Sequence, residues 1–90
     1  MKADKTQVTR LLKTARGQIE GILKMVEEDQ YCIDISNQLM AAQAILRRAN
    51  REVIQAHMAS CVREAMAQGD EAAMEQKIQE LAGIMDQLAK

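Results

Sequence analysis

The sequence predicts an all-α protein, and three observations support this. Its 90 residues include no proline and only four glycines. The composition is rich in good helix formers such as Ala, Leu, Met, Gln, Glu, Lys and Arg. Apolar residues recur at spacings of four and three in three successive segments, as in amphipathic helices. We expect a single domain, 1–90, with helices at about 6–28, 31–67 and 71–88.

The first segment carries one apolar face. Its residues are Val8, Leu12, Ala15, Ile19, Ile22 and Val26. Gly17 and Gly21 each cost a helix about 1 kcal/mol relative to alanine, a cost often offset where a neighbouring helix approaches closely. The acidic run at 27–30 is expected to form a turn.

The second segment predicts one long helix, since no Gly or Pro interrupts Tyr31 to Gln68. Its apolar positions, spaced by four and three, are Ile35, Leu39, Ala42, Leu46, Ala49, Val53, Ala56 and Ser60. This alternation is typical of a coiled-coil seam. A helix of 30 residues is about 45 Å long, so we expect much of it to pack against other chains.

A break at residues 68–70 precedes the third segment. Gly69 suits the position after a helix end, and Asp70 suits the N-cap of the next helix. The apolar positions that follow are Met74, Ile78, Leu81, Met85 and Leu88. Because Tyr31 is the only aromatic residue, the core is expected to be thin, aliphatic and rich in methionine, which favours an oligomer.

The charges are sorted by segment although the formal net charge is only −1. Residues 1–24 and 47–63 are basic, whereas residues 25–46 and 64–90 are acidic. The basic segments are therefore suited to face phosphate groups. No stretch approaches the ~20 apolar residues of a membrane span, and the start of the chain lacks a secretory signal, so we expect a cytoplasmic protein with no membrane partner. Catalytic motifs such as a Gly-rich phosphate loop are also absent, and we do not expect an enzyme.

Cys32, His57 and Cys61 are the candidate functional residues, because they include both cysteines and the only histidine. His57 and Cys61 are four apart and share one helical face. If one helix carries all three, Cys32 and His57 are separated by roughly 37 Å, and any joint site must form between chains. Two thiolates and one imidazole suit Cu(I) or, with an added water, Zn(II). A reactive or redox-sensing thiol and a purely packing role are the alternatives.

Residues 16–61 contain, in order, the stretches RGQIEGILKMVEEDQYC, DISNQLMAAQAILRRANREVI and HMASC. They resemble the copper-sensing (CsoR) branch of the CsoR/RcnR family of bacterial transcriptional repressors, over about Thr9 to Met66. The resemblance implies a three-helix protomer, a dimer of antiparallel long helices and a disc-shaped tetramer of two dimers. It also implies an apo form that binds operator DNA and is released by Cu(I).

The resemblance also assigns roles to residues. Cys32 of one protomer matches one ligand of the family's trigonal Cu(I) site, and His57 and Cys61 of its dimer partner match the other two. Persulfide-sensing relatives keep both cysteines but lack this histidine. The residues expected around the site are Tyr31, Glu75 and Gln76, with Gln76 standing where relatives carry a glutamate. The expected DNA contacts are Arg10, Lys13, Arg16, Arg48 and Arg51.

A second difference from the family concerns the first helix. Leu11 stands where relatives carry an arginine, and Arg10, one position earlier, points about 100° away around the helix. Two further functions stay open beside the copper-sensing repressor. One is a persulfide or redox sensor that joins Cys32 and Cys61 of opposite chains, and the other is a helical assembly protein or copper buffer that never touches DNA.

Overall fold

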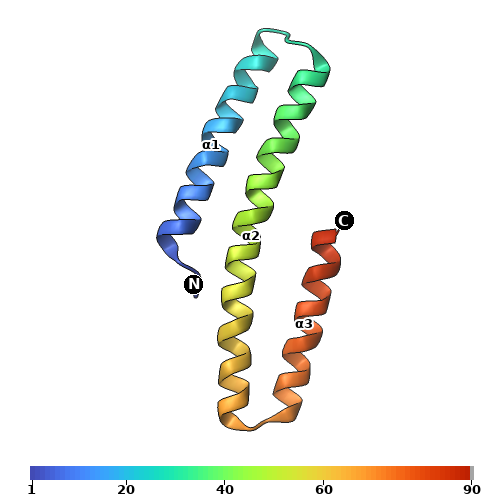
Figure 1. The fold of residues 1–90 in the computed structure, drawn as a ribbon. Helices are drawn as coiled ribbons and strands as arrows, with labels where there is room; N and C mark the ends of the chain where they lie inside the picture. The colour runs from blue at the N-terminus through green and yellow to red at the C-terminus, as the bar shows by residue number, and fades with distance from the viewer. Residues whose placement is uncertain (90) are drawn as a thin grey trace. The chain divides into compact units, whose positions relative to one another are not determined.

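The computed structural model describes residues 1–89, which form three α-helices (Figure 1). They are α1 (Lys5–Glu27), α2 (Cys32–Gln68) and α3 (Glu71–Ala89). The prediction of an all-α chain with a long second helix is confirmed; Lys90 lies outside the described residues. The chain divides into two compact units, one formed by Asp4–Glu52 and the other by residues from Val53 onward together with residues 1–3.

Helix α1 begins at a side-chain cap. The Asp4 Oδ1 atom accepts hydrogen bonds from the backbone amides of Thr6 at 2.9 Å and Gln7 at 3.4 Å. These amides have no partner inside the helix, so the carboxylate satisfies them and meets the positive end of the helix dipole.

The end of α1 is a Schellman motif with an unusual residue. The amide of Gln30 bonds to the carbonyl of Met25 at 3.0 Å, and that of Asp29 bonds to Val26 at 3.1 Å. Asp29 has a φ of 53°, the left-handed conformation that the motif requires and that glycine usually supplies. The turn into α2 therefore depends on a strained aspartate three residues before Cys32.

The break between α2 and α3 agrees with the sequence prediction. Gly69 has a φ of 68°, and the amide of Asp70 bonds back to the carbonyl of Ala65 at 3.4 Å. The Asp70 Oδ1 atom then accepts a hydrogen bond from the amide of Ala73 at 3.2 Å. Gly69 thus ends α2 and Asp70 caps α3.

In the unit Asp4–Glu52, α1 lies beside the first part of α2 (Figure 1). The buried apolar residues of this unit are Val8, Leu11, Ala15 and Ile22 on α1 and Ala42 and Ala49 on α2. The small Ala42 and Ala49 side chains are buried while the larger neighbours in the same predicted seam, Leu39 and Leu46, are 47% and 43% exposed. The apolar seam of α2 is therefore wider than this unit can cover. Helix α1 also has apolar side chains that the unit leaves exposed, namely Leu12, Ile19, Leu23 and Val26.

In the other unit, Met58 and Ala65 of α2 are buried, and Met74, Leu81 and Leu88 of α3 are half-buried. Ile78 and Met85 are exposed although they belong to the predicted apolar face. None of the helices within residues 1–89 has the length and apolar character needed to cross a membrane.

Candidate metal centre

His57 and Cys61 form a close pair on α2. They are four positions apart on a continuous helix, so their side chains lie one turn above the other. The distance between the His57 Nε2 and Cys61 Sγ atoms is 3.5 Å. His57 is exposed, and Cys61 is a half-buried free thiol. An imidazole nitrogen and a thiol sulfur are therefore placed side by side by one chain.

Cys32 is the first residue of α2 and is an exposed free cysteine. It lies in the unit Asp4–Glu52, whereas His57 and Cys61 belong to the other unit. Within the described residues 1–89, no group of three His, Cys, Asp or Glu side chains is placed to hold a metal ion. The single chain brings two of the three predicted ligands together and leaves Cys32 apart.

The three residues predicted to surround the metal are all exposed. Tyr31 is 68% exposed. Its carbonyl accepts a hydrogen bond from the amide of Ile35 at 3.2 Å, so Tyr31 is the N-cap residue of α2. Glu75 and Gln76 lie on α3. Glu75 lines a groove of about 400 Å³ between residues 65 and 78, together with Met66 and Met74.

The five predicted DNA contacts are exposed residues of the unit Asp4–Glu52. Arg48 is nine positions after Leu39, which places it on the side of α2 opposite that exposed leucine. On α1, Leu11 is buried with 5% exposure, so the position singled out as different from the family by the sequence resemblance is a core position here. The exposed Arg10 is held by its neighbour, because its guanidinium donates a hydrogen bond to Gln7 Oε1.

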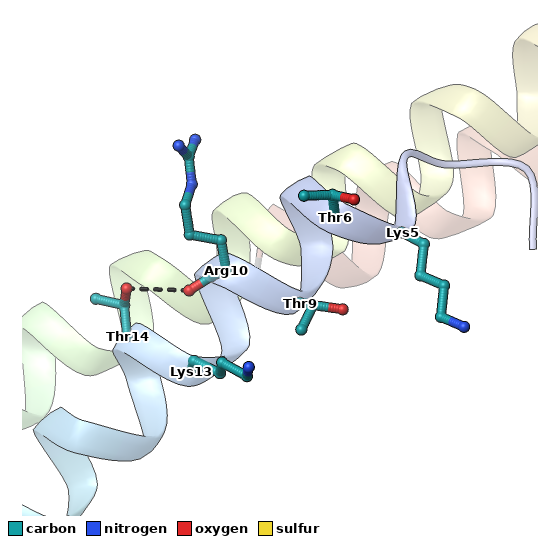
Figure 2. Close-up of a pocket in the computed structure, with 6 residues that line it drawn as sticks. All are labelled: Lys5, Thr6, Thr9, Arg10, Lys13 and Thr14. Atoms are coloured by element: carbon teal, nitrogen blue, oxygen red, sulfur yellow. Dashed lines mark hydrogen bonds between the residues drawn. The ribbon is translucent and has the colours of Figure 1, made fainter.

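A groove of about 530 Å³ runs along the outer surface of α1 (Figure 2). Its lining consists of basic and hydroxyl side chains: Lys5, Thr6, Thr9, Arg10, Lys13 and Thr14. Sequence reasoning found Arg10 and Lys13 but missed Lys5 and the three threonines. The spacing of four from Lys5 to Thr9 to Lys13 was the available signal, since such residues share a helical face.

The fold and these side chains define a helical protein with a Cys–His pair and a basic surface. Residues 4–87 match the model of the metal-sensitive transcriptional repressor family, and the chain belongs to that family. This family consists of repressors, in agreement with the prediction that the chain is not an enzyme.

Individual relatives are consistent with this assignment. The chain is 47% identical over 58 residues to the copper-sensing transcriptional repressor CsoR of Mycobacterium ulcerans, a match that covers 64% of this chain and 50% of that protein. It thus spans about half the length of that relative. The crystal structure of the copper-sensing repressor CsoR with Cu(I) from Geobacillus thermodenitrificans has a TM-score of 0.78 and 35% identity, covering 100% of this chain and 94% of that one. The nickel-responsive transcriptional regulator InrS has a TM-score of 0.79 and 27% identity, covering 98% of this chain and 96% of that one.

Proposed function

We propose that this protein is a Cu(I)-responsive repressor that binds operator DNA without copper and releases it when Cu(I) binds to Cys32, His57 and Cys61. The observation that carries the proposal is the 3.5 Å separation of His57 Nε2 and Cys61 Sγ. Membership of the metal-sensitive repressor family supports it, as do relatives named as copper-sensing.

The donor set fits Cu(I). Thiolate sulfur and imidazole nitrogen are the soft and intermediate ligands that Cu(I) prefers over hard oxygen ligands. Cys32 and Cys61 are free, and at least part of each side chain is accessible. Bound at these three residues, Cu(I) would supply one bond to each donor and so link Cys32 of one protomer to His57 and Cys61 of another.

A second copy of the chain is the proposed source of the missing ligand. The exposed apolar residues beside the buried seam, among them Leu12, Ile19, Leu39 and Leu46, need a partner surface. We infer a dimer of antiparallel long helices, and a tetramer of two dimers in the cytoplasm. Tyr31, Glu75 and Gln76 would then surround the metal.

DNA binding is assigned to the basic side of the unit Asp4–Glu52, where Arg10, Lys13, Arg16, Arg48 and Arg51 are all exposed. Contacts of arginine and lysine with phosphate groups make affinity fall steeply as salt rises. Copper and DNA binding are coupled if Cu(I) binds more tightly to an arrangement of the protomers that binds DNA less well, and the difference in affinity sets the size of the coupling.

Mixing two inactive variants tests the site between chains. Cys32→Ala retains His57 and Cys61, and the double variant His57→Ala/Cys61→Ala retains Cys32. Neither should bind Cu(I) tightly or release operator DNA. A mixed dimer of the two regains one of its two sites, and about half of the dimers are mixed when equal amounts assort at random, so refolding them together should restore about a quarter of the tight Cu(I) binding of wild type. No recovery on mixing, or full copper response of Cys32→Ala alone, would reject the proposed site.

Sensing of sulfur species is the second candidate, because the exposed Cys32 and the free Cys61 also suit disulfide or polysulfide formation between chains. Mass spectrometry after persulfide treatment separates the two functions. A sulfur sensor would form a cross-linked chain pair and release DNA equally well when His57 is replaced by alanine. Dependence of DNA release on His57 would support copper.

A further inference from the structure

The groove on α1 contains two rows of side chains. Lys5, Thr9 and Lys13 follow one another at intervals of four residues. Thr6, Arg10 and Thr14 form the second row at the same interval. In Figure 2 the side chains of Thr9 and Lys13 lie on one side of the helix and those of Thr6 and Arg10 lie on the other.

The two rows differ in their hydrogen bonds. In the second row, the Arg10 guanidinium donates to Gln7 Oε1, and the Thr14 hydroxyl donates to the Arg10 carbonyl at 3.0 Å (Figure 2). Among the described residues, the side chains of Lys5, Thr9 and Lys13 take part in no hydrogen bond or salt bridge. The first row therefore keeps all its donors for an outside acceptor.

The positive charges of Lys5 and Lys13 in the first row are not balanced by nearby acidic side chains on α1. The first turn of α1 contains no acidic residue, and the capping Asp4 carboxylate already accepts the amides of Thr6 and Gln7. The next acidic residue along the chain is Glu20. No carboxylate therefore offsets the charges of Lys5 and Lys13 between residues 5 and 19 of their own helix.

We propose that Lys5, Thr9 and Lys13 together bind one phosphate group of the DNA backbone. Each lysine is four residues from Thr9, a rise of about 6 Å along the helix axis, which the long lysine side chain spans. The Thr9 hydroxyl donates a hydrogen bond to the phosphate oxygen, and the two ammonium groups approach it from either side. This inference rests on the proposed repressor function and adds Lys5 and Thr9 to the DNA-contacting surface.

The test measures DNA affinity of the apo protein by fluorescence anisotropy at several salt concentrations. The variants are Lys5→Gln, Lys13→Gln and Thr9→Val, and Thr6→Val is the matched control on the other row. Thr9→Val should weaken binding at least about fivefold, as expected for loss of a hydrogen bond to a charged group, without changing the salt dependence. Because the two lysines share one phosphate, together they account for about 0.9 of the slope of log K against log salt in each DNA-bound protomer, and each lysine variant should make that slope shallower.

A phosphate contact carries no sequence information, so these losses should be equal on operator DNA and on a scrambled duplex of the same length. A loss confined to the operator would overturn the proposal in favour of a base contact. Binding by Thr9→Val equal to that of Thr6→Val would also overturn it, while copper-dependent release by these variants would leave the repressor function standing. Failure of the wild-type protein to bind operator DNA would reject both. Circular dichroism at matched concentration checks that the variants keep their helices.

Discussion

The Cys61 Sγ atom lies 3.5 Å from the His57 Nε2 atom, one helical turn away on α2. This pair is set by the spacing of four residues in a regular helix and needs no other part of the protein. Cys32, at the start of the same helix, belongs to the other compact unit. Two of the three proposed ligands are thus preformed, and in the proposed site assembly has to supply only the third.

Replacement of His57 separates copper sensing from DNA binding. His57→Ala should weaken Cu(I) binding at least about tenfold, because a directly bonded ligand is worth no less than the outer partners that tune such sites. Operator affinity without copper should stay unchanged, since His57 lies outside the basic unit. Competition with a Cu(I) chelator and a gel-shift titration check these two quantities. Gln55→Ala, an exposed change two residues away, is the control, and equal copper affinities of the two variants would contradict the assignment.

The exposed leucines of α2 predict how the chain assembles. Leu39→Glu and Leu46→Glu place a charge on the apolar surface that a second copy is proposed to cover, so each should shift the protein toward monomer. Asn37→Glu adds the same charge at an exposed position away from this surface and should leave the oligomer intact. Sedimentation velocity at equal protomer concentration measures the change, and unaltered assembly of both leucine variants would mean that another surface joins the chains.

Periodicity was sufficient to predict the helices, because alternating spacings of four and three leave little choice of secondary structure. Gly69 and Asp70 were also predictable, since each residue type is preferred at the position where the structure places it. Asp29 was not, because aspartate adopts the left-handed conformation far less often than glycine.

The candidate site was only partly predictable. The close approach of His57 and Cys61 follows from helical spacing alone. Which leucine is buried does not follow from the apolar pattern, because the pattern predicted Leu12 on the buried face, whereas Leu11 is buried and Leu12 is exposed. An apolar stripe of this width has two edges, and the sequence does not say which edge faces α2 of the same chain. The unpaired state of the Lys5 row depends on side-chain hydrogen bonds, which spacing does not determine.

Two glycine-to-alanine changes should have opposite effects on stability. In the chain a Cβ atom added at Gly17 would meet nothing within 4 Å, so Gly17→Ala should raise the free energy of unfolding by about 0.8–1 kcal/mol through helix propensity. Gly69 also has open space around it but has a φ of 68°, and Gly69→Ala should lower stability by about 1 kcal/mol. Urea unfolding at fixed protomer concentration measures both. Loss of stability in Gly17→Ala would indicate that another surface packs closely on this glycine in the oligomer.

Asp29→Gly should stabilise the protein, because glycine removes the steric cost of the left-handed conformation that Asp29 adopts at the end of α1. The gain is limited to about 1 kcal/mol, since glycine also gains conformational entropy in the unfolded state. Glu28→Gly is the control, because Glu28 has an ordinary φ of −88°, so its replacement relieves no strain; it brings the entropic cost and removes the 3.0 Å hydrogen bond that Gln30 Nε2 donates to Glu28 Oε2. Thermal unfolding at one protomer concentration should therefore rank Asp29→Gly above wild type and wild type above Glu28→Gly. The reverse order for the two variants would show that strain at Asp29 does not limit the stability of the turn that leads into Cys32.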